Sequence, residues 1–344
     1  MAPADVRLTS LVIAIIVTVI GVLAFARAIY VLYTRVAAGG PQPGRLRPVG
    51  KRLWMMIKTI LSHSEFKGRP AVRVAHWFVM LSFPILALTL KTGYGKLGNP
   101  AYKLGALEYF PPWEWLVELF AWGSFVGIIW LISVRLRSGH GSVSEAEGEG
   151  REGKADQRPS RFLGSTRWQA YFVEWVVFGV VFAVIGLRAL SYAAGVEGVA
   201  DEAGRLVTDP SMATLLHFPT TAWLGSLLTG LSDTAILNSI TTMGVAWHRF
   251  LAVVNVYARR EVDGSKTLGA ASPMLIDGVP FTNEEQLDEL DDDAVLGVGT
   301  VADMTWKQRL DLMTCTECGR CQELCPAWNT GKPLSPKLLM MEMR

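Results

Sequence analysis

This sequence has few cysteines and a small net charge. The 344 residues include four cysteines, all between positions 315 and 325, so a disulfide framework spread along the chain is excluded. The formal net charge is only +2, which gives no global basic field of the kind that binds nucleic acid. The Gly-rich stretches lack the strand and helix context of a dinucleotide-binding fold. The sequence also offers no catalytic triad or carboxylate pair for hydrolysis. We therefore expect neither a nucleic-acid-binding protein, a hydrolase nor an enzyme with a built-in flavin.

Apolar residues, in contrast, are abundant. Half of the residues are hydrophobic, twelve are Trp, and the mean hydropathy is +0.28. A chain of this composition is too apolar for an ordinary soluble protein, because soluble domains need more polar surface. We therefore expect an all-α membrane protein whose helices contact membrane lipid.

Apolar runs of membrane-spanning length occur in the first 260 residues. We expect a bundle of five spans, at about residues 11–33, 74–91, 113–134, 171–192 and 235–256. The first run is too long for a signal-peptide core and no small-residue cleavage site follows it, so it is expected to be retained. Another apolar stretch, residues 212–231, is interrupted by Pro219 and Gly225. We expect a partial or surface-lying helix there.

The charges of the loops predict the orientation of the bundle. The loops after the first and third runs are rich in Lys and Arg, whereas the loop after the second run holds only Lys96 and Lys103. Residues 193–233 contain Arg205 and five acids. The positive-inside rule then places the first and third loops in the cytoplasm and the N-terminus outside. Five spans put the C-terminal segment in the cytoplasm of a multi-pass plasma-membrane protein.

The four cysteines form one closely spaced motif. Cys315, Cys318, Cys321 and Cys325 follow the pattern C-x2-C-x2-C-x3-C-P. Bacterial ferredoxins use this spacing to hold a [4Fe-4S] cluster in thiolate ligands. A structural zinc site more often uses two separated C-x2-C pairs, and such crowding disfavours disulfides. Reducing conditions in the cytoplasm keep thiols available for iron.

The sequence contains no second motif of this kind. In two-cluster ferredoxins the fourth cysteine of one motif ligates the other cluster. Either Cys325 closes the same cluster or the chain is the front part of a longer protein, and we favour the second alternative. Residues 301–344 are then the start of an incomplete helical ferredoxin-like domain. Residues 261–300 are expected to form a linker with a short hairpin and an acidic run, which is either solvated or a docking surface for a basic partner.

Four of the five histidines flank or lie within apolar runs. These four are His63, His76, His217 and His248. An intramembrane histidine is a functional hypothesis by default, and imidazole is an axial ligand of b-type haem iron. If one helix carries both His63 and His76, its rise separates them by about 20 Å, enough for two stacked haems. Gly68 and Pro70 lie between them and are residues that break helices.

The number of haems stays open at this point. One arrangement pairs His63 with His248 for an inner haem and His76 with His217 for an outer haem. The other has a single haem between His76 and His248. A non-ligand role, such as capping a helix, remains the alternative for each histidine. Cations for the haem propionates near the inner interface are Arg69, Arg73 and Arg249.

Glu174 is a candidate catalytic residue near the inner end of the fourth apolar run. Its carboxylate can accept a proton from a quinol. The alternative is an ordinary interfacial glutamate, since a charge at the end of a span costs less than a charge at the bilayer centre.

Several segments together resemble a known family. They are residues 62–63, 75–80, 162–166, 171–175, 244–250 and 315–337. They look like the actinobacterial membrane iron-sulfur oxidoreductases of the electron-transfer-flavoprotein dehydrogenase type. In that family the N-terminal half is similar to the nitrate reductase gamma subunit, a five-span b-type cytochrome, and the C-terminal half to heterodisulfide reductase. Family members continue into a second ferredoxin motif and cysteine-rich repeats, which this sequence does not contain.

The resemblance implies an electron path. Reduced electron-transfer flavoprotein from fatty-acid oxidation would deliver electrons to the cluster, and haem b would pass them to menaquinone. Two other functions remain open. The chain is either a cytochrome and iron-sulfur subunit for another donor, such as a heterodisulfide-reductase-like partner, or a membrane redox sensor without turnover.

Overall fold

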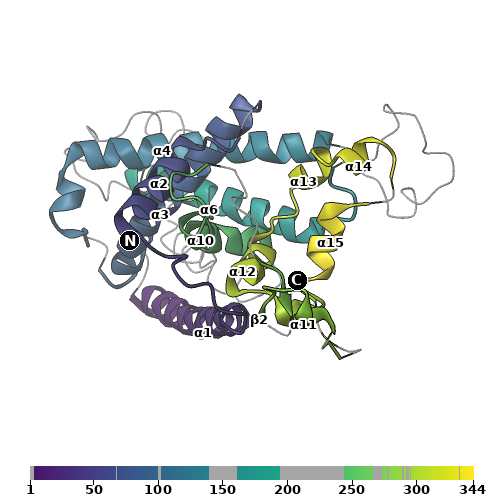
Figure 1. Ribbon diagram of the computed structural model, residues 1–344. Coiled ribbons are helices and arrows are strands. Elements are labelled where there is room, and N and C mark those ends of the chain that lie inside the picture. The colour runs from purple at the N-terminus through teal and green to yellow at the C-terminus, as the bar shows by residue number, and fades with distance from the viewer. Residues whose placement is uncertain are drawn as a thin grey trace. The chain divides into compact units, whose positions relative to one another are not determined.

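The computed structural model of the chain is mostly helical (Figure 1). It describes residues 4–66, 68–99, 102–138, 161–193, 244–265, 273–276, 279–288, 290–291, 294, 296–332 and 334–344. The chain divides into two compact units. The first consists of Met1–Ala28, Phe66–Ser138 and Arg167–Ile240, and the second of Ile29–Glu65, Gly139–Thr166 and Thr241–Arg344.

In the described part of the chain, four helices are long and apolar enough to cross a membrane. They are α1 (Ala4–Ala37), α3 (Pro70–Gly98), α4 (Pro111–Arg137) and α6 (Arg167–Ala193). Their apolar segments are Leu11–Ala37, Pro70–Gly95, Pro111–Arg137 and Arg167–Gly186. Each overlaps one of the first four predicted apolar runs. The prediction of long apolar helices at these four positions is therefore confirmed, and they are candidate membrane spans.

The fifth predicted span is only partly described. Helix α10 (Gly244–Tyr257) covers its C-terminal part, whereas residues 235–243 lie outside the described residues. The stretch 212–231 and His217 lie outside them as well. A total of five spans therefore stays a prediction.

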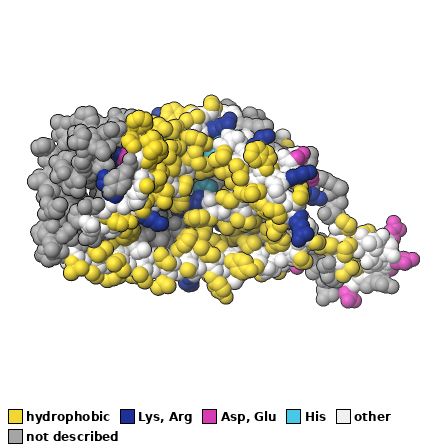
Figure 2. All heavy atoms as spheres, turned by 90° about the vertical axis from the view of Figure 1, so that its left-hand side faces the viewer, with side chains coloured by type: hydrophobic (Ala, Val, Ile, Leu, Met, Phe, Trp, Pro, Cys, Tyr) yellow, Lys and Arg dark blue, Asp and Glu magenta, His cyan; other side chains and the backbone are white. Residues whose placement is uncertain are grey.

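Apolar side chains point outward from the candidate spans. Figure 2 shows hydrophobic side chains over much of one face of the molecule. Along α1, exposed residues include Ile13, Ile16, Ile20 and Leu23, the last of them 65% exposed. Because a continuous apolar surface of this kind is unfavourable in water, it is what a lipid-facing helix requires.

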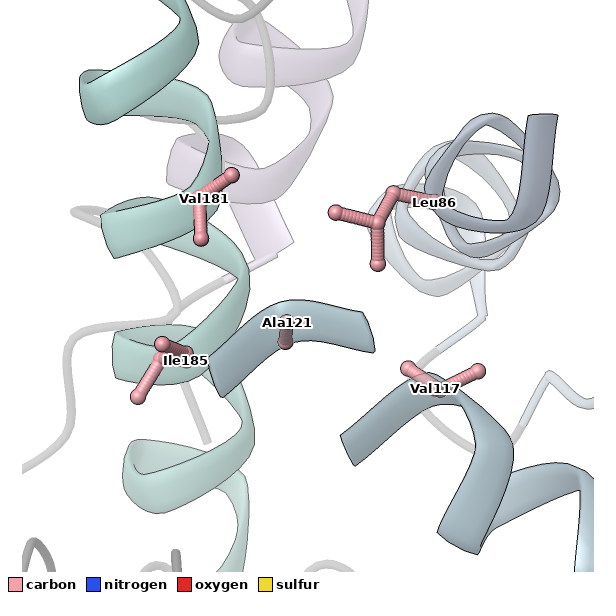
Figure 3. Close-up of a cluster of buried hydrophobic side chains, with 5 residues drawn as sticks. All are labelled: Leu86, Val117, Ala121, Val181 and Ile185. Atoms are coloured by element: carbon pink, nitrogen blue, oxygen red, sulfur yellow. The ribbon is translucent and has the colours of Figure 1, made fainter. Parts of the chain in front are cut away.

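The core of the first unit is formed by α3, α4 and α6. Leu86 of α3, Val117 and Ala121 of α4, and Val181 and Ile185 of α6 are buried together (Figure 3). Since α4 packs against both α3 and α6, its small and branched side chains fill the space between the helices.

A glycine lets α3 and α4 approach closely. A Cβ added at Gly127 of α4 would lie 2.9 Å from the carbonyl oxygen of Ala75. One turn earlier, the Ser124 hydroxyl donates a 3.1 Å hydrogen bond to the Phe78 carbonyl. Small residues at helix contacts and hydroxyl bonds of this kind are typical of packing within membranes.

Ion pairs link α4 to α6 near both ends of α4. Arg135 Nε donates to Glu174 Oε1 at 2.6 Å. Arg188 donates to Glu114 at 2.6 Å and to Glu118 at 3.0 Å. Charges within a span are expected to pair in this way, because an unpaired charge is costly in a low-dielectric environment.

A helix that the sequence analysis did not anticipate precedes the second span. Helix α2 (Val49–Ser62) ends at His63, which has a left-handed backbone with φ +47°. Gly68 has φ +73°, and helix α3 starts at Pro70. A continuous helix carrying both His63 and His76 is therefore wrong. The physical reason is that proline lacks the N–H that a helix interior needs but fits the first turn.

In the second unit, α10 packs against both α2 and α12 (Trp306–Thr314). The buried Arg52 of α2 donates to the carbonyl of Arg259 at 2.6 Å, just after α10 ends. Asn255 of α10 donates to Asp311 of α12 at 2.8 Å. These polar contacts fix α10 against the helix that leads directly into the cysteine motif.

The remaining elements of the second unit are short. Strands β1 (Leu275–Ile276) and β2 (Val279–Pro280) pair antiparallel at the position of the expected hairpin. Helix α11 (Glu285–Asp288) lies in the acidic run. The cysteine motif is followed by short helices, namely α13 (Arg320–Glu323), α14 (Pro326–Asn329) and α15 (Pro336–Glu342).

Candidate functional site

The cysteine motif forms a tight backbone turn after α12. Cys315 caps the end of α12, and two left-handed residues follow, Glu317 with φ +56° and Gly319 with φ +70°. Gly319 begins α13, which carries Cys321, and Cys325 precedes Pro326 at the start of α14. Left-handed residues reverse the chain within a few positions. The turn thus places three cysteines within one short loop.

The three thiols of this loop influence one another electrostatically. Burial raises the pKa of the Cys315 thiol, and neighbouring Cys318 raises it further. Burial likewise raises the pKa of the Cys321 thiol, with Cys318 again contributing. Backbone hydrogen bonds from Glu317 and Gln322 act in the opposite direction, since they stabilise a thiolate.

These features fit an iron-sulfur cluster. Thiolates that neighbour one another and accept backbone hydrogen bonds are the donor set of a [4Fe-4S] cluster. Within the described residues, no three His, Cys, Asp or Glu side chains are arranged to hold a single metal ion. In a [4Fe-4S] cluster each thiolate binds a different iron atom, so its ligands need not point at one metal ion. Cys318 and Cys321 are exposed, whereas Cys315 and Cys325 are partly buried.

Residues 161–166, which we call the 161–166 segment, lie against the cysteine loop in the second unit. The Ser165 hydroxyl donates to the Glu317 carbonyl at 3.0 Å, and the Thr166 N–H donates to the Glu317 carboxylate at 2.6 Å. A Cβ added at Gly319 would overlap the Arg161 carbonyl oxygen, so only glycine allows this approach. The loop therefore has a fixed protein neighbour on one side.

Helix α10 is a second neighbour of the loop. A Cβ added at Gly244 would overlap the Cys315 carbonyl oxygen. The same carbonyl accepts a 3.2 Å hydrogen bond from Arg344, whose other nitrogen donates to Glu317 at 2.6 Å. Residues four positions apart share a helix face, so His248 lies on the face of α10 that carries Gly244.

His63 and His248 both lie in the second unit, on elements that pack against each other. The His63 Nδ1 atom lies 2.6 Å from the Ile60 carbonyl oxygen, and the His248 Nδ1 atom lies 2.5 Å from the Val245 carbonyl oxygen. When Nδ1–H donates to a carbonyl, Nε2 keeps a lone pair for a metal. This tautomer is the one that an axial haem ligand requires, and the pairing of His63 with His248 for an inner haem stays a prediction.

The other predicted haem residues are placed less completely. The His76 ring of α3 lies 5.1 Å from the Phe66 ring in the first unit. Because His217 lies outside the described residues, its pairing with His76 stays a prediction. A single haem between His76 and His248 joins residues of different units and also stays a prediction.

The three arginines predicted to meet haem propionates occupy two units. Arg69 and Arg73 lie at the start of α3 in the first unit. Arg249 lies on α10 in the second unit, with its guanidinium 5.3 Å from the centre of the Phe250 ring. Their role toward a haem stays a prediction.

Glu174 is buried, and it is ion-paired with Arg135 in the first unit. Its Oε1 atom accepts from Arg135, whereas its Oε2 atom has no hydrogen-bond partner in the described part of the chain. The pair explains why a carboxylate is stable there. The remaining oxygen is available to a proton, so the catalytic candidate of the sequence analysis is retained as a proposal.

Sequence reasoning missed three charged residues beside the cysteine loop. They are Glu317, Lys337 and Arg344. Glu317 lies inside the motif at a position that ligand spacing does not constrain. Lys337 is 0% exposed although it is a lysine, and it follows Pro336 at the start of α15. A lysine next to apolar residues 338–341 was the only sequence signal for its burial.

Comparison with known proteins gives partial matches. A protein of Chromohalobacter salexigens named probable membrane-anchored ferredoxin is 48% identical over 62 residues, which is 18% of this chain and 9% of that protein. A protein of Syntrophomonas wolfei named EtfAB:quinone oxidoreductase is 35% identical over 96 residues, 28% of this chain and 11% of that protein. A protein of Bacillus subtilis named probable iron-sulfur-binding oxidoreductase FadF is 50% identical over 48 residues, 14% of this chain and 7% of that protein.

The matches cover about a tenth of each relative's length. No family model and no solved structure matches the chain. The relatives support an iron-sulfur oxidoreductase or electron-transfer protein, and together with four candidate spans they support a membrane location.

Proposed function

We propose that this chain is a membrane-bound oxidoreductase that carries single electrons from a cytosolic donor to menaquinone. Electrons enter at a cytoplasmic [4Fe-4S] cluster on Cys315, Cys318 and Cys321, with Cys325 as fourth ligand of this or a second cluster. The predicted histidine ligands would hold haem b, in one or two copies, and the haem would supply one-electron chemistry between the cluster and menaquinone. The donor is reduced electron-transfer flavoprotein from fatty-acid oxidation.

The observation that carries this proposal is the cysteine loop. Three neighbouring thiols lie in a turn that follows α12 directly. Those of Cys315 and Cys321 accept backbone hydrogen bonds, and Cys318 and Cys321 are exposed. Exposed cluster ligands suit transfer from a soluble protein, since electron-transfer partners must approach the redox group closely. The name of the Syntrophomonas wolfei relative supports the flavoprotein and quinone assignment.

Two of the proposed haem ligands lie in the same unit as the cysteine loop, so a haem held by them could accept the electron within this unit. His248 lies on α10, whose residue Gly244 contacts the cluster loop, and His63 ends the neighbouring helix α2. Helix α10 would thus connect both redox groups. When bound, haem supplies one-electron chemistry at a potential set by its axial ligands.

The proposed topology is the one that the loop charges predict, with the N-terminus outside and the cysteine loop in the cytoplasm. Glu174, whose Oε2 atom has no hydrogen-bond partner among the described residues, is the proposed proton-transfer group at the quinone. Because menaquinone takes up two protons when it is reduced, a protonated Glu174 would donate one of them. If Glu174→Gln left quinone turnover unchanged, Glu174 would be only the structural partner of Arg135.

The test is steady-state reduction of a soluble menaquinone analogue by enzymatically reduced electron-transfer flavoprotein. The full 344-residue chain in detergent is compared with Cys318→Ser. We expect turnover by the chain and none by the variant. Turnover with another reduced donor alone would favour the subunit that serves a different partner. A cluster that is reduced without any quinone turnover would favour the redox sensor.

A further inference from the structure

Lys337 has three hydrogen-bond partners in the 161–166 segment. Its Nζ atom donates to the Ser165 hydroxyl at 2.7 Å, to the Arg161 carbonyl at 3.3 Å and, at shorter range, to the Leu163 carbonyl. The side chain is 0% exposed. An ammonium group has three protons to donate, so this set satisfies all of them. The lysine thus holds the 161–166 segment in one conformation.

The same lysine lies beside the cysteine loop, because Ser165, which accepts from Lys337, itself donates to the Glu317 carbonyl. Its charge interacts with the thiols of Cys315, Cys318 and Cys321 and with the carboxylate of Glu317. Burial lowers the pKa of Lys337 to about 8, and these four groups act against that lowering. The ammonium is therefore a cation removed from water and placed beside the loop.

Lysine burial is costly, and its cost needs an explanation. A buried ammonium is usually compensated by an anion within hydrogen-bond reach. The three hydrogen-bond partners of Lys337 are instead two carbonyls and a hydroxyl, all of them neutral. The nearby Glu317 carboxylate is already paired with Arg344, so thiolates that carry a cluster would add the negative charge that compensates Lys337. The negative charge of a bound cluster would therefore compensate the buried ammonium of Lys337.

We propose that Lys337 raises the reduction potential of the cluster held by the cysteine loop and positions the 161–166 segment over it. The proposal rests on the proposed function, because it presupposes the cluster. On reduction the cluster gains one electron, no bond forms or breaks, and its charge becomes one unit more negative. A fixed buried cation stabilises the more negative state more strongly, so reduction becomes easier.

Glu317 is the opposite charge in the same place. Its carboxylate is buried and is held by Arg344 and by the Thr166 N–H. An anion beside the cluster disfavours the extra electron. Neutralising Lys337 and neutralising Glu317 should therefore shift the potential in opposite directions, which a merely structural role of either residue does not predict.

The test is a redox titration of the reduced cluster by electron paramagnetic resonance, on the full chain in detergent with dithionite as the reductant. The main variant is Lys337→Gln, which loses the charge but keeps an N–H donor for Leu163. Lys337→Arg keeps the charge, and Glu317→Gln removes the anion. The matched control is Lys332→Met, because Lys332 is an exposed lysine five residues before Lys337.

We expect Lys337→Gln to lower the reduced-to-oxidised ratio at the unmodified protein's midpoint about tenfold, or about 59 mV for one electron. The midpoint potentials of Lys337→Arg and Lys332→Met should stay near that of the unmodified protein, and the midpoint potential of Glu317→Gln should rise. A Lys337→Gln midpoint equal to that of Lys332→Met would overturn the proposal. So would a downward shift in Glu317→Gln.

Two further outcomes are decisive. If Lys337→Gln loses the cluster while Lys337→Arg keeps it, a cation at this position is needed to bind the cluster, which supports the charge role. If both lose it while Lys332→Met keeps it, the charge role is wrong. A missing cluster signal in the unmodified chain would instead contradict the proposed function.

Discussion

The backbone N–H of Thr166 donates a 2.6 Å hydrogen bond to the carboxylate of Glu317. These residues are 151 positions apart in the sequence. Thr166 directly precedes α6, a candidate membrane span, and Glu317 lies between two proposed cluster ligands. The contact therefore joins the cysteine loop to the segment from which a span begins.

Gly319→Ala tests how closely the 161–166 segment approaches the cysteine loop. The added Cβ would overlap the Arg161 carbonyl, in addition to the strain of φ +70°. We expect a loss of about 1–3 kcal/mol in folding free energy beyond the backbone strain, and loss of most bound iron and sulfide. Both are measured on the purified chain.

The control for this substitution is Gly297→Ala. Gly297 has φ +74°, but a Cβ there would meet nothing within 4 Å. It therefore has the same left-handed strain, about 1–2 kcal/mol, without an overlap. Equal iron contents in the two variants would show that the 161–166 segment does not constrain the loop.

Gly244→Ala tests the contact between α10 and the cysteine loop. Replacing a helical glycine by alanine normally stabilises a helix by roughly 0.5–1 kcal/mol. At Gly244 the new Cβ would overlap the Cys315 carbonyl, so we expect destabilisation and a lower iron content. At Gly179 of α6 a Cβ meets nothing within 4 Å, and Gly179→Ala should follow the normal trend. If Gly244→Ala and Gly179→Ala changed the folding free energy in the same direction, the proposed contact between α10 and the cysteine loop would be contradicted.

Arg188→Met tests the ion pairs between α4 and α6. Glu118 is 1% exposed and also accepts a 2.9 Å hydrogen bond from Trp122. Without Arg188 this buried carboxylate loses its ion pair, and breaking a buried ion pair from one side costs about 3–5 kcal/mol. Unfolding in sodium dodecyl sulfate, followed by tryptophan fluorescence, measures the loss.

The control for Arg188 is Arg137→Met, at the exposed end of α4. It should change the unfolding free energy by less than about 0.5 kcal/mol. The double variant Arg188→Met with Glu118→Gln should regain part of the lost stability, since it removes the uncompensated charge. If it did not, the cost of losing Arg188 would not come from Glu118.

His248→Ala tests the proposed haem ligand on α10. Its Nδ1 atom lies 2.5 Å from the Val245 carbonyl oxygen, and an Nδ1–H that donates to a carbonyl is the usual arrangement of a histidine that binds metal through Nε2. We expect a haem absorption band to disappear from the reduced spectrum, and the same band to disappear in His63→Ala. His140→Ala is the control, because the sequence around His140 is rich in Gly, Ser and Arg and not apolar. An unchanged spectrum in His248→Ala would refute the assignment.

The positions of four spans could be predicted from the sequence, because a membrane helix needs a long apolar run and little else. Pro70 and Gly68 also indicated the break before α3. Helix α2 was missed because Lys51, Arg52 and Lys58 interrupt its apolar residues. Its amphipathic pattern serves packing in the second unit and not membrane crossing.

The spacing of the cysteines predicted the candidate cluster ligands, whereas the sequence did not predict which residues surround the cysteine loop. Lys337 contacts Leu163, which is 174 positions away, and no local pattern predicts a pairing at that separation. Glu118 and Arg188 are a similar case, 70 positions apart. Such contacts depend on how helices pack, and that is decided by the whole fold and not by adjacent residues.

The most direct test of the account is a dithionite-reduced minus oxidised visible spectrum of the purified chain, with iron and haem quantified on the same sample. The account predicts sharp b-type bands together with iron in excess of the haem, and the haem count chooses between one histidine pair and two. Iron without b-type bands would contradict it, because the electron path from the cysteine loop into the membrane would be missing.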